Sequence, residues 1–205
     1  MTTTMNDNIN VTTTLDYYNK NASSFVTDTQ SVSFTPIQDK FISLLPPQAS
    51  ILDFGCGSGR DTKYFWDKGF DVTAIDGSLE LAKIASKYAG IPVKCMLFHE
   101  LRDRNKYDGI WACSSLLHLP TDELVTVLSK IYTALRPQGI LYASFKYGDF
   151  EGMRNGRYFT DLTEESFSEL LRNIDNFKII DTWITGDARP GRENEKWLNL
   201  ILKKD

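Results

Sequence analysis

The chain has 205 residues, of which 41% are hydrophobic and 24% charged, and this fits one soluble globular domain with a single core. Its net charge of −4 argues against broad binding of nucleic acids, which needs clustered Lys and Arg. The three cysteines, Cys56, Cys95 and Cys113, show no paired spacing, and no apolar run reaches the ~18 residues of a membrane-spanning helix, so we expect a cytoplasmic protein with reduced thiols.

The first 35 residues are predicted to form an N-terminal tail or cap, and residues 36–205 the domain proper. Within the cap we expect a short helix at 13–18 and a mobile loop at 21–33. From residue 36 onward, hydrophobic periodicity and turn residues predict alternating helices and strands. Helices are predicted at 36–45, 60–68, 78–88 and 121–135, and strands at 50–54, 71–75, 92–98, 107–114 and 140–145.

The remainder of the chain departs from this alternation. A loop is predicted at 146–158, followed by a helix from Thr163 to about Asn173. Two further strands, 177–185 and 197–203, have no helical segment between them and are predicted to pair antiparallel. Alternating strands and helices otherwise predict a parallel sheet with helices on both faces. The predicted fold is therefore α/β: a Rossmann-like, doubly wound sheet of seven strands, mostly parallel, with an antiparallel last strand.

The segment from Asp53 to Gly59 carries three glycines at alternate positions, between a predicted strand and a predicted helix. Glycine lets the backbone approach a ligand closely, and a helix start offers free N–H groups to an anionic group. Dinucleotide sites use G-x-G-x-x-G, whereas this chain has Arg60 at the position after its third glycine. Asp76 ends the second strand, where its carboxylate can accept hydrogen bonds from ribose hydroxyls. Asp53 could order the turn and receive an ammonium group, a position unfavourable beside a pyrophosphate. A plain structural turn is the alternative to this nucleoside site.

The glycine turn, Asp76 and the segments 107–111 and 135–139 together resemble the class I S-adenosylmethionine-dependent methyltransferases. Residues 135–139, Leu-Arg-Pro-Gln-Gly, are similar to the turn before the fifth strand of that family, with Gln138 in place of a glycine. The phrases at 57–61 and 69–76 resemble a small single-domain subgroup, the tellurite-resistance methyltransferases. The resemblance covers residues 36–145 and implies S-adenosyl-L-methionine as the cofactor.

The same resemblance implies where the cofactor would lie. The glycines would hold its methionine end, Asp76 its ribose, and the segment after the third strand its adenine, through packing of Phe98 or Leu101 or through Glu100. The implied cofactor-binding residues are Asp53, Gly55, Cys56, Gly57, Gly59, Asp76, Gly77, Ser78, Phe98, His99, Glu100, Leu101, Cys113 and Ser114. The sequence has no metal-ligand spacing, so no metal is predicted.

Methyl transfer from a sulfonium is an in-line displacement, so the protein mainly aligns and desolvates the acceptor and in some cases deprotonates it. After the fourth strand the sequence lacks both an Asn/Asp-Pro-Pro-Tyr/Phe run and a Pro-Cys pair, which argues against adenine or glutamine amino groups and against cytosine C5. His118 lies just beyond that strand and is predicted as a general base, with a structural helix cap as the alternative. Cys113, inside an apolar strand, is not expected to be a nucleophile.

Two later loops carry arginines interleaved with aromatic residues, and arginine pairs with carboxylates, phosphates and oxyanions. We expect these loops to form an anion-recognising lid, with solvated surface charge as the alternative. Its predicted substrate-binding residues are Tyr147, Arg154, Arg157, Arg189 and Arg192. Tyr17, Tyr18 and residues 21–34 could fold over the cofactor from the N-terminal side.

The predicted function is methyl transfer from S-adenosylmethionine to a small, anionic or nucleophilic acceptor, by a monomer or homodimer. One alternative is methylation of a modified RNA nucleotide or a protein, which the acidic charge disfavours. A nicotinamide-dependent oxidoreductase is a second alternative, and the missing G-x-G-x-x-G counts against it. A non-catalytic module that binds the cofactor is the third.

Overall fold

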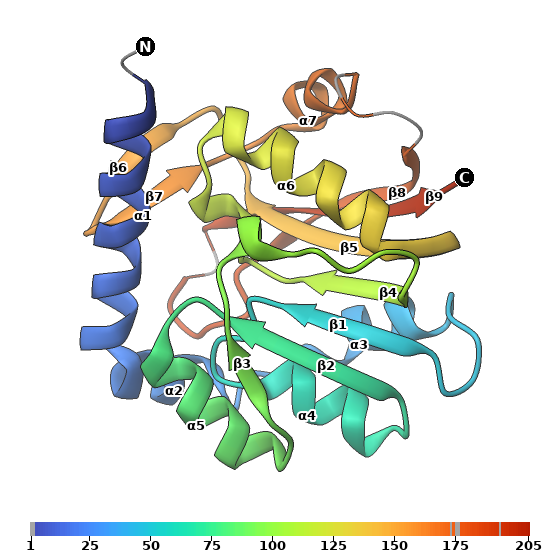
Figure 1. Ribbon diagram of the computed structural model, residues 1–205. Helices are drawn as coiled ribbons and strands as arrows, with labels where there is room; N and C mark the ends of the chain where they lie inside the picture. Colours follow the sequence, from blue (N-terminus) through green and yellow to red (C-terminus); the bar gives the residue numbers. More distant parts are fainter. Residues whose placement is uncertain (1–2, 173, 175–176, 193) are drawn as a thin grey trace.

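A computed structural model describes residues 3–172, 174, 177–192 and 194–205 of the chain. Its centre is a seven-stranded sheet in the order β3-β2-β1-β4-β5-β9-β8 (Figure 1). The strands are β1 (Ser50–Phe54), β2 (Asp71–Asp76), β3 (Val93–Cys95), β4 (Tyr107–Ala112), β5 (Leu135–Lys146), β8 (Phe177–Gly186) and β9 (Lys196–Lys204). β1 to β5 pair in parallel, whereas β9 lies antiparallel between β5 and β8. The predicted doubly wound sheet with its antiparallel last strand is confirmed.

Helices cover both faces of this sheet. The helices are α1 (Thr3–Lys20), α2 (Ala22–Thr29), α3 (Thr35–Ile42), α4 (Arg60–Asp67), α5 (Leu79–Ala89), α6 (Thr121–Ala134) and α7 (Glu164–Leu171), with short 3₁₀ turns η1 (Phe98–Glu100) and η2 (Leu116–His118). In Figure 1, α6 and α7 lie on one face and α3, α4 and α5 on the other. The predicted helix end near residue 173 lies outside the described residues.

Burial explains why the strand and helix patterns were readable. The central strands are nearly continuous apolar runs because both of their faces are covered; Ile51, Leu52 and Phe54 of β1 are fully buried. Helix α6 instead buries one stripe, including Leu124, Leu128 and Ile131, against the sheet. These apolar contacts supply the main stabilising term of the domain.

Two segments predicted as loops contain regular structure. Helix α2 lies within the predicted loop 21–33, where burial of Ala22 gives it tertiary support that its polar sequence does not signal. The predicted loop 146–158 contains most of a hairpin, β6 (Glu151–Arg154) and β7 (Arg157–Thr160). Its two-residue turn is Asn155-Gly156, both with positive φ (52° and 76°), and this dipeptide is the strongest short-range hairpin signal that a sequence can carry.

The N-terminal segment is more ordered than a tail. Helix α1 runs beside β7 and α5, and the Thr14 hydroxyl accepts a hydrogen bond from the Tyr158 backbone N–H at 2.9 Å. Figure 1 shows α1 along the edge where β1, β4 and β5 end. Because the carboxyl ends of parallel strands meet at that edge, α1 faces the place where ligands bind in such sheets.

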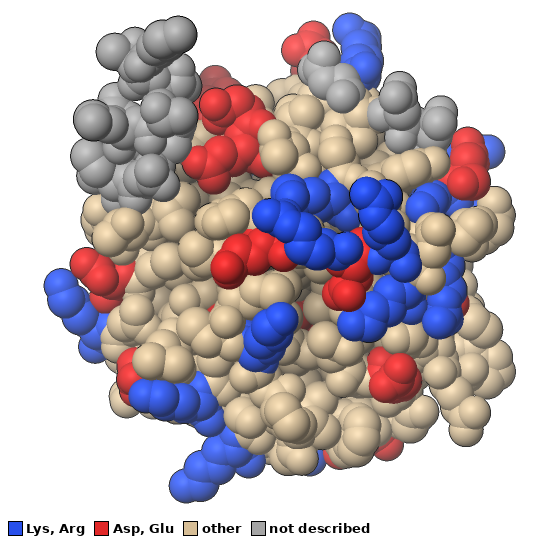
Figure 2. All heavy atoms as spheres, viewed as in Figure 1, with Lys and Arg blue, Asp and Glu red and all other residues tan. Residues whose placement is uncertain are grey.

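The opposite region carries most of the visible positive charge. Figure 2 shows Lys and Arg side chains gathered over α6 and the segment that leads into β4. That segment carries Arg102, Arg104 and Lys106, and α6 carries Lys130. The segment begins beside η1, where Arg102 donates to the His99 carbonyl at 2.8 Å, and its end, Lys106, leads into the amino end of β4. No helix among the described residues is long and apolar enough to cross a membrane.

Candidate active site

The glycine turn between β1 and α4 has a backbone that only glycine adopts without strain. Gly55, Gly57 and Gly59 have φ of 90°, 54° and 80°. A Cβ at Gly55 would come within 2.5 Å of Ser115 Cβ, and one at Gly59 within 2.9 Å of Ala85 Cα. The turn therefore packs against the segment after β4 and against α5, with its backbone open to the cleft described below.

Two carboxylates hold this turn in place. Asp76 accepts hydrogen bonds from the backbone N–H groups of Gly57 and Ser78, each at 2.8 Å, and burial raises its pKa to about 6. Asp53 accepts the Thr62 hydroxyl at 2.5 Å, and burial, with the nearby Asp61 carboxylate, raises the pKa of Asp53 well above its usual range. Asp53 thus lies beneath the turn, whereas Asp76 borders the open space beside it.

A cleft of about 100 Å³ opens beside the turn; we call it the turn cleft. It brings together eight of the predicted site residues: Gly55, Gly57, Asp76, Gly77, Phe98, His99, Ser114 and His118. Helix α1 adds Val11, Thr14, Leu15 and Tyr18 as a further wall. Sequence reasoning anticipated only Tyr18 among these four, because nothing local marks the face of α1 that packs here.

Several predicted cofactor residues do not line the turn cleft. The Glu100 side chain folds back to accept the Leu97 backbone N–H at 2.7 Å, and Leu101 is buried in the core. Gly59 packs on α5, and the Ser78 hydroxyl caps that helix by accepting the Leu81 N–H. In their place Met96 and Leu97, which no motif marks, line the turn cleft next to Phe98.

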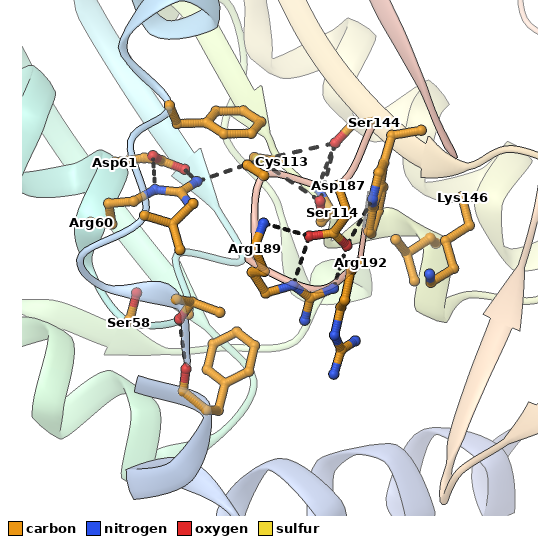
Figure 3. Close-up of a pocket in the computed structure, with 18 of the residues that line it drawn as sticks. Ser58, Arg60, Asp61, Cys113, Ser114, Ser144, Lys146, Asp187, Arg189 and Arg192 are labelled. Carbon is orange, nitrogen blue, oxygen red and sulfur yellow. Dashed lines mark hydrogen bonds and ion pairs between the residues drawn. The ribbon is translucent and has the colours of Figure 1, made fainter. Parts of the chain in front are cut away.

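A second cavity of about 160 Å³ adjoins the first on the side of β5, β8 and β9; we call it the inner cavity (Figure 3). Tyr18, Phe25, Gly57, Ser114 and His118 line both cavities. The inner cavity also gathers predicted residues from distant segments: Cys56, Cys113, Arg157, Arg189 and Arg192. Tyr147 and Arg154 instead line an outer hollow of about 430 Å³, which shares Arg157 and Arg192 with the inner cavity.

Most cations of the inner cavity already have acidic partners. Figure 3 shows Arg60 and Arg189 directed at their neighbours Asp61 and Asp187, at 2.7 and 2.5 Å. Lys146 pairs with Glu195, and Arg192 lies 3.7 Å from the same carboxylate. These pairs leave little net charge on this part of the wall.

Arg157 differs from those cations. Within the described part of the chain, no carboxylate lies within ion-pair distance of it, and its Nε is buried without a hydrogen-bond partner. Its guanidinium lies over three aromatic rings, with its carbon 4.5 Å from the ring centroid of Tyr17, 5.1 Å from that of Phe159 and 5.8 Å from that of Tyr18. Leaving the buried Nε without a hydrogen bond is costly, so this side chain favours an anionic group in the cavity.

His118 sits where the two cavities meet. Its Nδ1 lies 2.6 Å from the Tyr158 carbonyl oxygen and its Nε2 lies 2.7 Å from the Tyr18 hydroxyl. Burial, opposed by the Tyr158 hydrogen bond and reinforced by Arg157, lowers the pKa of His118 to about 4. Burial raises the pKa of the Cys113 thiol to about 12, which fits the expectation that Cys113 is not a nucleophile.

Comparison with known proteins follows the same region of the chain. Residues 51–139, from β1 to the turn in β5, match the family model described as "Methyltransferase domain". The fold agrees beyond that segment: the structure of a Burkholderia thailandensis 1,6-didemethyltoxoflavin-N1-methyltransferase superposes with a TM-score of 0.79 at 24% identity, over 97% of this chain and 90% of the other.

Two relatives found by sequence are longer than this chain. A protein of Bacillus subtilis (strain 168) named "Putative methyltransferase YqeM" is 31% identical over 116 residues, which are 51% of this chain and 47% of its own length. A malonyl-[acyl-carrier protein] O-methyltransferase of Salmonella typhimurium is 28% identical over 153 residues, 68% of this chain and 60% of its own length. This chain therefore spans about half to three fifths of the length of these two relatives.

Proposed function

We propose that this chain transfers a methyl group from S-adenosylmethionine to a small, anionic or nucleophilic acceptor. The observation that carries the proposal is the shared wall of the turn cleft and the inner cavity. An in-line displacement needs the methyl donor and the acceptor atom in contact and shielded from water. Two adjoining cavities that meet at Gly57, Ser114 and His118 provide such an arrangement.

The residues of the turn cleft fit the cofactor. The backbone at Gly55 and Gly57 lines the turn cleft without a side chain, and it would hold the methionine end. A Cβ at Gly57 would come within 3.0 Å of Phe25 and would narrow this space. Asp76 would accept the ribose hydroxyls, and Phe98 would pack beside the adenine. When bound, the cofactor supplies a methyl group activated on a sulfonium. Asp53 would act indirectly, by ordering the turn through Thr62.

Arg157 supports an acceptor that carries negative charge. It is the cation of the inner cavity for which the described residues provide no ion pair, and an acceptor anion would supply one. The names of the relatives cover different acceptors, malonyl-[acyl-carrier protein] and N1 of 1,6-didemethyltoxoflavin. A metalloid oxyanion, as the likeness to tellurite-resistance methyltransferases suggests, is a further member of the proposed class.

The first test is thermal unfolding with S-adenosylmethionine, S-adenosylhomocysteine, NAD and NADP in separate samples. A ligand that binds only the native state adds about 2.7 kcal/mol of stability at 100 times its Kd. We expect a higher midpoint with the two adenosyl-sulfur compounds alone. The Asp76→Ala variant should lose most of this rise, whereas Asp71→Ala, at the exposed start of the same strand, should keep it. A rise with NAD or NADP alone would overturn the proposal.

A further inference from the structure

Three groups form a hydrogen-bonded chain across the junction of the two cavities: the Tyr158 carbonyl, the His118 imidazole and the Tyr18 hydroxyl. A carbonyl oxygen can only accept, so the proton of the neutral imidazole must lie on Nδ1, which donates to Tyr158. Nε2 is then unprotonated, and the Tyr18 hydroxyl donates to it. These hydrogen bonds therefore have a direction: they allow a proton to pass from Tyr18 to His118.

Tyr18, at the end of this hydrogen-bonded series, is open to the acceptor. Tyr18 and His118 line both cavities, so the Tyr18 oxygen is available to a molecule in the inner cavity. Arg157 Nη1 lies 3.5 Å from the same oxygen. The aromatic side chains Phe25, Phe34, Phe159 and Trp197 also line the inner cavity. The cavity volume of about 160 Å³ is close to the roughly 150 Å³ of an engineered cavity that binds benzene.

From this juxtaposition we infer that the acceptor is a planar ring compound whose reacting N–H or O–H group gives its proton to Tyr18 and, through Tyr18, to His118. The inference deepens the proposed function and rests on it. It separates acidic ring nitrogens and enol or phenol oxygens from carboxylates, which are already ionised at neutral pH and need no proton acceptor. The aromatic walls accept a flat ring, and Arg157 stabilises the negative charge that develops on it.

The step balances in atoms and charge. The acceptor's proton moves to the Tyr18 oxygen while the Tyr18 proton moves to Nε2 of His118. The electron pair left on the acceptor atom forms the new bond to the methyl carbon, and the pair of the broken S–C bond stays on sulfur. The positive charge that disappears from sulfur is matched by the one that arrives on His118.

A neutral imidazole suits this role at physiological pH. Burial keeps His118 unprotonated, so it is ready to accept a proton before each turnover. Burial would also oppose the imidazolium, but the sulfonium charge is lost from the same junction as the proton arrives. Tyr18 is a catalytic residue in this scheme, since its oxygen touches the acceptor, and the Tyr158 carbonyl positions the imidazole.

The first experiment reads the imidazole directly. The chain has only two histidines, and the second, His99, is exposed and serves as an internal reference. In a nitrogen NMR spectrum of isotope-labelled protein, we expect His118 to carry its proton on Nδ1 and the Nε2 resonance to move in Tyr18→Phe. The Tyr17→Phe variant removes a neighbouring hydroxyl from the same helix and should leave that resonance in place. A proton on Nε2 of His118 would overturn the inference.

The second experiment adds probes to the protein loaded with S-adenosylhomocysteine. Uracil and phenol are ring acids whose N–H and O–H groups keep their protons at neutral pH, and benzoate is a ring carboxylate of similar size. We expect a ring acid to shift the His118 Nε2 resonance in wild type and not in Tyr18→Phe, with a smaller shift from benzoate. If no ring acid shifts it, or if benzoate shifts it more, the inference is wrong.

The third experiment measures transfer of labelled methyl to the same probes. Tyr18→Phe should lower kcat about 100-fold, at the lower end of general acid–base contributions, with KM little changed. His118→Asn should lower it similarly, and the double variant no further, because the two residues act as one unit. Equal kcat in Tyr18→Phe and wild type, or methylation of benzoate alone, would refute the inference. A protein that binds neither adenosyl-sulfur compound would refute the proposed function instead, and the spectrum of the free protein would still report the relay.

Discussion

Asp76 has two roles: it orders the glycine turn and it borders the turn cleft. Both carboxylate oxygens already accept backbone N–H groups, yet burial raises its pKa to about 6. A ribose would donate further hydrogen bonds to the ionised form. Ligand binding and proton binding therefore compete at this carboxylate.

The first prediction is that the affinity for S-adenosylhomocysteine falls as the pH is lowered through about 6. Below that value the protonated Asp76 must lose its proton to accept the ribose, so Kd rises about tenfold per pH unit. Calorimetric titrations between about pH 5 and pH 8 would measure this. Asp76→Asn should bind more weakly at neutral pH and show a flatter profile, whereas Asp71→Asn should follow wild type. Parallel profiles for wild type and Asp76→Asn would contradict the assignment.

The second prediction concerns the stability linked to His118. Burial lowers the pKa of His118 in the folded protein to about 4, from the 6.5 of an unperturbed histidine, so the unfolded chain binds the proton more tightly. Stability is therefore present above pH 6.5 and is lost as the pH falls toward 4, by at most about 3 kcal/mol. Urea unfolding of wild type and His118→Asn at several pH values would show the difference narrowing in that window. A constant difference would mean that the imidazole titrates normally in the folded protein.

What the sequence could predict at this scale was limited by distance along the chain. Gly55, Gly57 and Asp76 carry local patterns whose geometry is shared by many nucleotide-binding turns, and all three border the turn cleft. Tyr18 lies 100 residues from His118, and the contact exists only because α1 packs beside β7. No spacing rule reports such a pair, so the partner of the predicted base had to come from the structure.

At the scale of elements, two short devices position the site. The Asn155-Gly156 turn places Arg157 at the start of β7, from where it reaches the inner cavity. The glycine turn fits against α5, with Gly59 in contact with Ala85. The hairpin was predictable from its dipeptide, whereas α2 was not, because its buried Ala22 and half-buried Phe25 depend on the surface they meet.

The third prediction compares two glycines with nearly the same backbone. Gly59 (φ 80°, ψ 7°) and Gly90 (φ 75°, ψ 11°) are both left-handed, so an alanine costs about 1–2 kcal/mol at each. A Cβ at Gly59 would also lie 2.9 Å from Ala85 Cα, whereas one at Gly90 meets nothing within 4 Å. Gly59→Ala should therefore be the more destabilising and should also weaken S-adenosylhomocysteine binding.

Denaturant unfolding and calorimetry on both variants would test this prediction. Gly90→Ala provides the cost of the backbone angle alone, because it ends α5 on the side away from the turn cleft. Equal losses of stability with unchanged ligand affinity in both would show that close packing of the turn on α5 does not shape the cleft.

In the molecule as a whole, the parallel part of the sheet was predictable because its strands are apolar throughout and are bounded by glycine or proline. That pattern predicts a parallel sheet with helices on both faces, and such sheets bind ligands at the carboxyl ends of their strands. The insertion of β9 between β5 and β8 brings Trp197 and Asn199 to the inner cavity. Only the assembled sheet shows that the last strand of the chain helps to form this cavity.

The last prediction concerns how that final strand is fastened. Lys204 is 9% exposed, and its ammonium donates to the carbonyls of Tyr132 and Leu135, at 2.8 and 2.7 Å, and to Asn105 Oδ1 at 3.1 Å. One side chain thus joins β9 to the end of α6 and to the segment before β4.

Lys204→Met keeps the apolar stem but leaves these acceptors without the ammonium, so we expect the free energy of unfolding in urea to fall by about 1–3 kcal/mol. Lys203→Met changes the next residue of the same strand, which points to the other face of the sheet, and should lose less than about 0.5 kcal/mol. Equal losses in the two variants would mean that the apolar contacts of β9, rather than this ammonium, hold the strand against α6.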